Sequence, residues 1–427
     1  MKPRRIASLS DDERTEITDR SADADVADDV RPIVERVRDE GDDALREFTR
    51  RFDGVEVDSI RVEEDEIREA RESCDDEVFE AIEHAAERIR DFHEKQVRDD
   101  WSETEDGVEV GRRFVPLSSA GAYVPGGGAA YPSTALMTVV PARVAGVENV
   151  VACTPPSVPD ATLAALNVAG ADAVYRVGGA QAISAMAYGT ETVEACDAIV
   201  GPGNVYVTEA KRQVRDDEAA RIEFPAGPSE ILVVADETAN PRHVASDMLA
   251  QTEHDADASA VLTATDEELA DEVVDEMEKR IEEAERGETM KSATCEILVG
   301  DLDACVEFTN EYAPEHLSIV TSDDDAVLSR IRNAGSVFLG THTPVAAGDY
   351  ATGTNHVLPT AGGARLYGGL SVDDFVKTTT YQRLSRNGIE KLAETVTTLA
   401  RAEGLEEHAR SVEERLEPED MKGESDR

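Results

Sequence analysis

The sequence predicts an α/β fold made of two incomplete, doubly wound Rossmann-like units that face each other. A helical segment precedes these units and a helical arm follows them. Two observations predict this fold. From residue 147 onward, short apolar runs alternate with amphipathic segments of about ten residues, which is typical of a parallel sheet covered by helices on both faces. The alternation occurs in two sets, and 427 residues are enough for two or more domains.

The apolar runs and the helical spacing give the expected elements in order. Strands of the first set are expected at 147–153, 173–177, 198–200 and 231–235, and strands of the second at 260–263, 296–299, 318–320 and 336–339. Helices are expected at 160–168, 180–187, 205–214, 240–254, 267–283, 302–311 and 324–333. Outside the two sets we expect helices over 25–97, a short extended segment at 108–116 and helix again over about 373–416.

These elements divide the chain into five parts. The expected parts are an N-terminal arm at 1–24, a first α/β domain of 25–122 together with 230–370, a second Rossmann-like domain at 123–229, a helical arm at 371–416 and a disordered tail at 417–427.

Composition limits the classes of function. The formal net charge is -49, the acidic residues are spread along the chain, and 35 of the 43 basic residues are arginine. Dispersed carboxylates with little lysine are typical of surfaces adapted to multimolar salt, where the Debye length falls to roughly 3 Å. Disorder would be the alternative reading of such a charge, but the long apolar strands argue against it. No basic stripe is present, so nucleic-acid binding is not expected.

The five cysteines have no CxxC spacing, which predicts neither a disulfide framework nor a thiolate metal site. No apolar run reaches membrane length, and no hydrophobic region follows the first residues. We therefore expect a soluble, cytoplasmic protein that does not bind membranes.

One helix start is informative. Asn240 can cap the helix that follows, and Pro241 stands at its first position, where the missing N–H costs nothing. Gln251 and His254, three residues apart, point to the same side of that helix. A Gln carbonyl beside an imidazole is an uncommon pair, and it suggests a metal site with more than a structural role.

Three glycine turns close strands of the first unit, and each carries a polar or aromatic side chain: Tyr123, Gln181 and Asn204. Such turns let backbone amides at helix N-termini approach a phosphate, and open α/β sheets bind ligands at this edge. None matches GxGxxG with a downstream acid. A single turn of this kind would be an ordinary connection, whereas the three together favour a cofactor cleft.

Polar groups suited to catalysis stand in two other segments. Glu315 and His316 are adjacent at the start of a strand, and Asp349 and His356 lie in a glycine-containing loop after another. A lone histidine is usually structural. With His254 and His408, four histidines in such settings, and with Gln251 and Asp349 as oxygen donors, the sequence favours a metal and acid/base site.

Taken in order, these segments resemble the histidinol dehydrogenases, enzymes of the last two steps of histidine biosynthesis. The resemblance covers roughly residues 25 to 416. It rests on Tyr-Val-Pro-Gly-Gly at Tyr123, Gly-Gly-Ala-Gln at Gln181, Gly-Pro-Gly-Asn at Asn204, Ala-Gly-Pro-Ser-Glu at Ser229, the 251–254 segment, Pro-Glu-His-Leu at His316 and the 348–356 loop. Two positions depart from the family pattern: Glu223 replaces an Asp, and Asp255 replaces a Gly common in the family.

The resemblance implies oxidation of L-histidinol to L-histidine through an aldehyde, with reduction of two NAD. It implies one Zn²⁺ per subunit, held by Gln251, His254, Asp349 and His408, with two further positions for substrate nitrogens. His316 would be the base for the hydroxyl proton, and Glu315 would activate the water that attacks the aldehyde. Adjacent residues on a strand would diverge, so both can serve one site only if the backbone turns at Pro314-Glu315-His316.

The same resemblance assigns the remaining contacts. Substrate would touch Ser229 and Glu403 as well as His316 and the four metal ligands, with His356 in a supporting place. Tyr123, Gln181 and Asn204 in the 123–229 domain would touch NAD. The arm at 371–416 would make a homodimer, in which Glu403 and His408 complete the site of the partner subunit. Two alternatives stay open from the residues themselves: a zinc-dependent hydrolase and a non-catalytic NAD-binding protein.

Overall fold

The structure is a computed structural model of the chain that describes residues 1–20, 26–126, 130–224, 227–253, 256–284 and 286–417. The chain forms two compact units. Unit 1 comprises Met1–Val97 and Leu117–Phe375, and unit 2 comprises Arg98–Pro116 with the chain from Val376 onward. Within the described ranges, no helix is long and apolar enough to cross a membrane.

Unit 1 contains a parallel sheet of six strands. Its order is β1 (Arg4–Arg5), β11 (Thr294–Val299), β10 (Ser259–Ala264), β9 (Glu230–Ala235), β12 (His316–Val320) and β13 (Ser336–Leu339). Strand β9 is buried along its whole length, as expected for a parallel strand covered on both faces. Ile231 and Val233 pack into one core cluster, whereas Leu232 and Val234 pack into another on the opposite face.

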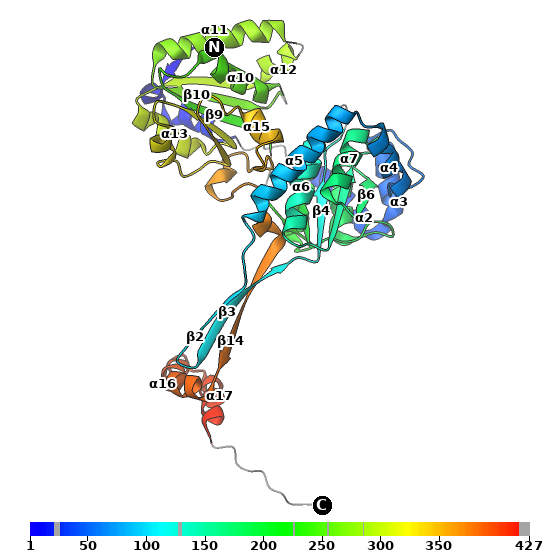
Figure 1. Cartoon of the computed structure of the whole chain (residues 1–427), viewed down its shortest axis with the longest axis vertical. Coiled ribbons are helices and arrows are strands. Elements are labelled where there is room, and N and C mark those ends of the chain that lie inside the picture. Colours follow the sequence, from blue (N-terminus) through cyan, green and yellow to red (C-terminus); the bar gives the residue numbers. More distant parts are fainter. Residues whose placement is uncertain (21–25, 127–129, 225–226, 254–255, 285, 418–427) are drawn as a thin grey trace, which may run out of the picture. The chain divides into compact units, whose positions relative to one another are not determined.

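Helices cover both faces of this sheet (Figure 1). Helices α10 (Pro241–Thr252) and α11 (Glu267–Glu283) pack on β9, β10 and β11, while α13 (Leu302–Tyr312) packs against β9 and β10. The remaining helices of this part are α1 (Asp11–Thr18), α12 (Gly287–Ser292), α14 (Asp324–Leu328) and α15 (Val345–Tyr350), with short 3-10 turns at η1 (Ile6–Ser8), η2 (Gly363–Arg365) and η3 (Val372–Phe375). The expected cap is confirmed, because the Asn240 side chain accepts a hydrogen bond from the Arg242 N–H and Pro241 is the first helical residue.

A second parallel sheet, of five strands, lies in the same unit. Its order is β6 (Ala173–Arg176), β5 (Asn149–Thr154), β4 (Ser119–Tyr123), β7 (Ala198–Val200) and β8 (Arg221–Ile222). Its own helices are α6 (Pro132–Val144), α7 (Asp160–Ala169), α8 (Gly179–Tyr188) and α9 (Val205–Asp216). The alternation of parallel strands and helices is therefore confirmed, but β9, expected in the first set, belongs to the six-stranded sheet, and β4 was not among the expected strands.

The N-terminal helices belong with this second sheet. These helices are α2 (Ala27–Glu40), α3 (Asp42–Phe52), α4 (Glu64–Ser73) and α5 (Asp76–Glu94). Helices α2 and α3 pack on α8, with α2 also on α9, whereas α4 packs on α7 and α5 packs on both α6 and α7. The expected grouping of 25–122 with 230–370 differs from these contacts, because helical spacing marks an apolar face without naming the surface that covers it. The expected arm at 1–24 contributes β1 to the six-stranded sheet, and α1 packs on α13.

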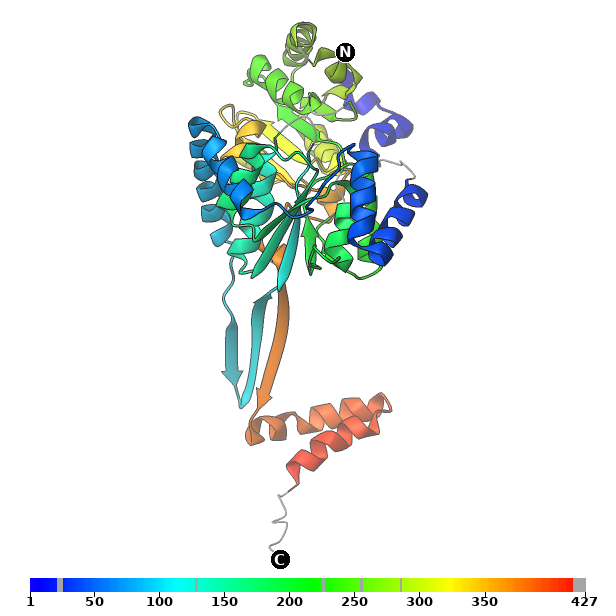
Figure 2. The same cartoon turned by 90° about the vertical axis from the view of Figure 1, so that its right-hand side faces the viewer.

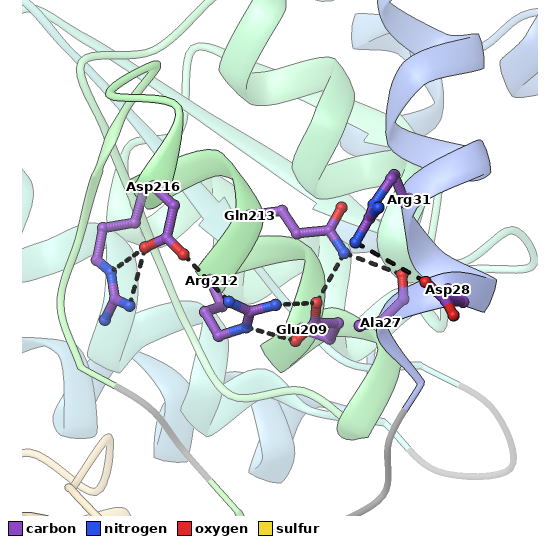
Figure 3. A network of polar contacts seen from close by, with 8 residues as sticks. Ala27, Asp28, Arg31, Glu209, Arg212, Gln213 and Asp216 are labelled. Atoms are coloured by element: carbon purple, nitrogen blue, oxygen red, sulfur yellow. Dashed lines mark hydrogen bonds and ion pairs between the residues drawn. The ribbon is translucent and has the colours of Figure 1, made fainter.

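A polar network on α9 reaches α2 through Gln213 (Figure 3). The Gln213 side-chain amide donates to the Ala27 carbonyl at 3.2 Å and to Glu209 at 2.7 Å. Arg212 donates two hydrogen bonds of 2.7 Å to Glu209 and one of 3.1 Å to Asp216. Arg212 shows how arginine, the predominant basic residue of the chain, binds a carboxylate through two N–H donors at once.

Unit 2 holds a three-stranded antiparallel sheet and two helices. The strand order is β14 (Val376–Leu384), β3 (Val108–Pro116) and β2 (Trp101–Glu105). Helices α16 (Arg386–Ala402) and α17 (Glu406–Leu416) pack on each other at the end of these strands (Figure 2). The expected extended segment at 108–116 is confirmed.

The helix expected from about residue 373 is wrong in its first part, because Val376–Leu384 is a strand. Three consecutive threonines and Tyr381 favour extended backbone, and the partner strand β3 comes from far earlier in the chain. The expected arm at 371–416 thus covers α16, α17 and β14 but omits β2 and β3.

Candidate active site

Glu315 and His316 lie where α13 passes into β12. Ala313 ends the helix in the left-handed conformation, with φ of 52°, and the chain then turns into the strand. His316 Nδ1 lies 3.4 Å from Oε2 of Glu315, and both side chains are almost fully buried. The turn that lets neighbouring residues converge is therefore present, one residue before Pro314.

Backbone groups of β9 hold this pair in place. The Glu230 N–H donates to Glu315 Oε2 at 2.8 Å, and the Glu230 carbonyl lies 3.0 Å from His316 Nδ1. A carbonyl can only accept, so Nδ1 carries a proton in this arrangement. The neutral imidazole then has its lone pair on Nε2.

His316 Nε2 faces Asp349, in α15. It lies 3.5 Å from Oδ1 of Asp349 and has no hydrogen-bond partner within the described ranges. Burial by itself disfavours the charged ring, but the negative charges of Glu315 and Asp349 outweigh it and raise the pKa of His316 to about 10. The ring thus stays protonated at neutral pH unless one of these charges is engaged elsewhere.

His356 connects the Asp349 segment to the five-stranded sheet. Its Nδ1–H donates to the Asp349 carbonyl at 2.9 Å, and its Nε2 lies 3.2 Å from the Thr134 hydroxyl in the first turn of α6. The preceding residue makes a second link to α6, because the Asn355 side-chain amide donates to the Met137 carbonyl at 2.8 Å. Burial lowers the pKa of His356, so the ring is held neutral. These contacts match a supporting role better than proton transfer.

The glycine turns gather around Tyr123, at the carboxyl end of β4. The Tyr123 hydroxyl accepts a hydrogen bond of 3.0 Å from the Gly179 N–H at the start of α8. Gly201 has φ of +116°, and a Cβ on it would lie 2.1 Å from the Tyr123 carbonyl oxygen, so only glycine fits. The turns after three strands therefore lie within contact distance of one residue.

The other two residues expected at the cofactor have different places. Gln181 is buried in the first turn of α8. Asn204 caps α9, because its side-chain oxygen accepts hydrogen bonds from the N–H groups of Tyr206 and Val207 at 3.1 and 3.2 Å. The Asn204 oxygen is committed to the helix, so its side-chain NH₂ group remains for a ligand.

A buried ion pair fixes the Gly201 turn, and sequence reasoning missed it. Lys211 Nζ lies 2.7 Å from Glu223 Oε1, which also accepts from the Gly201 N–H at 2.9 Å, while Lys211 donates to the Gly201 carbonyl. Burial raises the pKa of Glu223, and the Lys211 charge opposes that shift. The sequence offers two signs of this pair. Lys211 is one of only eight lysines in the chain, and Glu223 is one of the two positions that depart from the family pattern.

Lys211→Met is expected to destabilise the protein by about 3 kcal/mol, because it leaves the Glu223 carboxylate buried and unpaired. Thermal unfolding in high salt measures the loss. Arg212→Met on the same helix is the matched control, since Arg212 is about half exposed in its pair with Glu209 and should cost less than about 1 kcal/mol. Equal losses from both variants would contradict the role assigned to Lys211.

The sequence pattern of the family described as histidinol dehydrogenase matches residues 17–416. The histidinol dehydrogenase of Haloarcula marismortui is 56% identical over 425 residues, 98% of this chain and 100% of the relative. That of Halobacterium salinarum is 54% identical over 423 residues, 97% and 99% of the two chains. The crystal structure of histidinol dehydrogenase from Elizabethkingia anophelis has a TM-score of 0.91 and 39% identity, and the match covers 96% of each chain.

The chain belongs to the histidinol dehydrogenase family. This membership confirms the resemblance drawn from the sequence, including its likeness to haloarchaeal members, and it confirms the α/β fold. Histidinol dehydrogenases are NAD-dependent oxidoreductases, which agrees with glycine turns at the carboxyl ends of parallel strands.

The metal ligands expected in a histidinol dehydrogenase are only partly described. Gln251 is buried in the last turn of α10, and Asp349 lies beside His316. His254 lies outside the described residues, and His408 belongs to unit 2. In the described part of the chain, no three His, Cys, Asp or Glu side chains form a group that could hold a metal ion.

The chemistry of the available donors nevertheless suits zinc. An amide oxygen, a carboxylate and imidazoles are all groups that Zn²⁺ accepts. His316 Nε2 and Asp349 Oδ1 are too far apart for a good hydrogen bond, so the Asp349 carboxylate is not committed to this ring.

Three further residues were expected to contact substrate. Ser229 is half-buried immediately before β9, and its carbonyl accepts from the Ser259 N–H at 3.0 Å. Glu403 ends α16 and His408 lies in the first turn of α17, both with exposed side chains on unit 2. The structure therefore brings together Glu315, His316 and Asp349 of the expected site residues, with Glu230 as the residue that sequence reasoning missed.

Proposed function

We propose that the chain oxidises L-histidinol to L-histidine through L-histidinal and reduces two NAD in succession. The observation that carries this proposal is the hydrogen bond between His316 Nδ1 and the Glu230 carbonyl, which leaves Nε2 as the basic atom of a buried ring. A base in a buried site can accept the proton from the hydroxyl oxygen while hydride leaves the carbon that bears this hydroxyl for the nicotinamide of NAD. The distance of 3.4 Å between Glu315 and that ring supports the role proposed for Glu315, which is to activate water for attack on the aldehyde.

Zn²⁺ fits this scheme as a resident cofactor held by Gln251, His254, Asp349 and His408, where it would polarise the substrate and orient it. Asp349 then has two neighbours that depend on its charge, the metal and His316. Engagement of the Asp349 carboxylate weakens the attraction that raises the pKa of His316. The pKa of His316 then falls from its raised value, which favours the neutral ring that can act as the base.

The NAD site is proposed at the carboxyl end of the five-stranded sheet. Tyr123, Gln181 and Asn204 all follow or end strands there, and α8 and α9 begin at this edge. The hydrogen bonds of His356 to Thr134 and Asp349 run from this sheet toward His316. They support a cofactor held near the acid/base pair. We also propose that the enzyme works in the cytoplasm, as suits a biosynthetic step that uses NAD.

We further propose a homodimer in which Glu403 and His408 complete the partner's site. Helix α16 exposes Leu392, Val396 and Leu399, whose spacing of four and three residues makes an apolar stripe on one face. A stripe of this kind on a helix with a charged remainder is typical of a surface that packs on another chain. A second copy is the occupant that a shared active site requires.

The test is the stoichiometry of the reaction. Protein with zinc, histidinol and excess NAD in high salt should form two NADH per histidinol, followed by absorbance. High salt is needed because the net charge of -49 would destabilise the fold by self-repulsion when salt is removed. No NADH from folded protein loaded with zinc would overturn the proposal, and hydrolytic activity instead would favour a zinc hydrolase.

A further inference from the structure

A largely buried arginine from the N-terminal segment contacts Glu230, the residue whose backbone holds Glu315 and His316. Arg20 follows α1, and its side chain is 11% exposed. Its guanidinium carbon lies 3.4 Å from the centre of the Tyr312 ring, and Nη2 donates to the Tyr312 carbonyl at 2.7 Å. Nε lies 3.2 Å from Oε1 of Glu230, whose side chain is 4% exposed.

This ion pair is not an obvious source of stability. Removing two charges from water costs several kcal/mol, and the pair recovers that cost only when every polar atom is satisfied. Nε and Nη1 of Arg20 and Oε2 of Glu230 have no hydrogen-bond partner within the described ranges, so Nε meets Glu230 as an ion pair and not as a hydrogen bond. An incompletely satisfied pair of this kind calls for a role other than holding the fold together.

Glu230 is also the residue that holds the catalytic pair. Its N–H donates to Glu315 and its carbonyl accepts from His316, while its own Oε1 accepts from the Ala361 N–H at 2.7 Å. Arg20 therefore fixes the side chain of a residue whose backbone fixes Glu315 and His316. A shift of Glu230 would move the hydrogen bond to the Glu315 carboxylate directly.

The charges around Glu230 also indicate that Arg20 affects the Glu315 carboxylate. Burial and the negative charge of Glu315 raise the pKa of Glu230 to about 7, and the positive charge of Arg20 opposes that rise. Without Arg20, the buried carboxylates of Glu230 and Glu315 would lose the positive charge that opposes the rise in the pKa of Glu230. They would repel each other, or one would take up a proton.

We propose that Arg20, acting through Glu230, is a positioning residue for the Glu315 carboxylate in the oxidation of the aldehyde. The inference rests on the proposed function, which gives Glu315 the task of activating water. Arg20 touches neither Glu315 nor His316 in any described contact, so its effect is indirect. The aldehyde step depends on Glu315 and should suffer more than the alcohol step, which depends on Nε2 of His316.

The experiment compares Arg20→Gln with Arg14→Gln. Arg14 is a matched control, because it also pairs with a glutamate, Glu311 at 2.6 Å, and lies over a ring of α13, Phe308 at 5.5 Å, but reaches no site residue. Histidinol and histidinal are supplied in separate assays with zinc and NAD, and kcat and KM are measured for each.

Arg20→Gln should lower kcat for histidinal by about a hundredfold with little change in KM, as expected for a misplaced catalytic group. The kcat for histidinol to histidinal should fall less than about threefold, and Arg20→Lys should recover part of the loss because it restores the charge without the planar fork. Arg14→Gln should leave both rates within about twofold of wild type.

Equal loss on both substrates, or no loss, would overturn the proposal. If Arg20→Gln does not fold, the double variant Arg20→Gln/Glu230→Gln carries the test, since it leaves no unpaired buried carboxylate at Glu230. The same selective loss is expected there, and wild-type rates in the double variant would also overturn the proposal. A wild-type protein that oxidises neither substrate would instead refute the proposed function.

Discussion

Glu315→Gln is expected to stop the reaction at the aldehyde. The substitution keeps the size of the side chain and can still accept the Glu230 N–H, but an amide cannot take a proton from water. Loss of a general base typically costs about a thousandfold in rate. Histidinol should then give one NADH instead of two, and an aldehyde trap should capture histidinal. Two NADH at the wild-type rate would remove Glu315 from the mechanism.

The same substitution should change the pH dependence of the first step. The Glu315 charge is the foremost of the contributions that raise the pKa of His316, so its removal lowers that pKa. A base must be deprotonated to act, and its activity rises as pH passes the pKa. The rising limb of the alcohol oxidation should therefore move to lower pH in Glu315→Gln. A limb that stays in place would mean that another group is the base.

Glu311→Gln serves as the control for both readouts. It makes the same chemical change four residues earlier on α13, where Glu311 pairs with Arg14 and is partly exposed. Neither the NADH stoichiometry nor the pH profile should differ from wild type, because this carboxylate has no described contact with Glu315 or His316.

The α/β core could be predicted from local pattern because its strands are apolar along their whole length. Runs such as Ile231–Ala235 are buried on both faces, so their composition alone identifies them. Strand β14 lacks that mark, because it is mostly exposed and its threonines pair with a strand far away in the chain. The two-residue strands β1 and β8 are too short for any periodicity to show.

The candidate site also contains some residues that could be predicted from the sequence and others that could not. Glu315 and His316 stand together in the sequence, and the turn at Ala313 brings them together in space. Glu230 was visible only as the last residue of a motif, since its importance comes from backbone groups that every residue has. Arg20 contacts it from a segment whose composition suggests nothing more than a charged surface. Contacts of this kind between distant segments leave no local pattern in the sequence.

Mixing two inactive variants is expected to restore activity if the active site is shared between subunits. His316→Ala removes the base from unit 1, and His408→Ala removes a proposed zinc ligand from unit 2. In a mixed dimer, one site would lack both groups and the other would be complete. Random exchange makes about half of the dimers mixed, so about one quarter of the wild-type activity should return.

A second mixture makes this result decisive. His316→Ala and Asp349→Ala both alter unit 1, in side chains that lie 3.5 Å apart. If unit 1 of each subunit supplies both groups to one site, no mixed dimer of these variants contains a complete site. This mixture should therefore stay inactive. Recovery of activity in both mixtures would show that subunit exchange restores activity by some means other than a shared site. Recovery in neither mixture would place His408 in the site of its own chain. Only recovery confined to the first mixture requires α17 of one subunit to supply the metal site of the other.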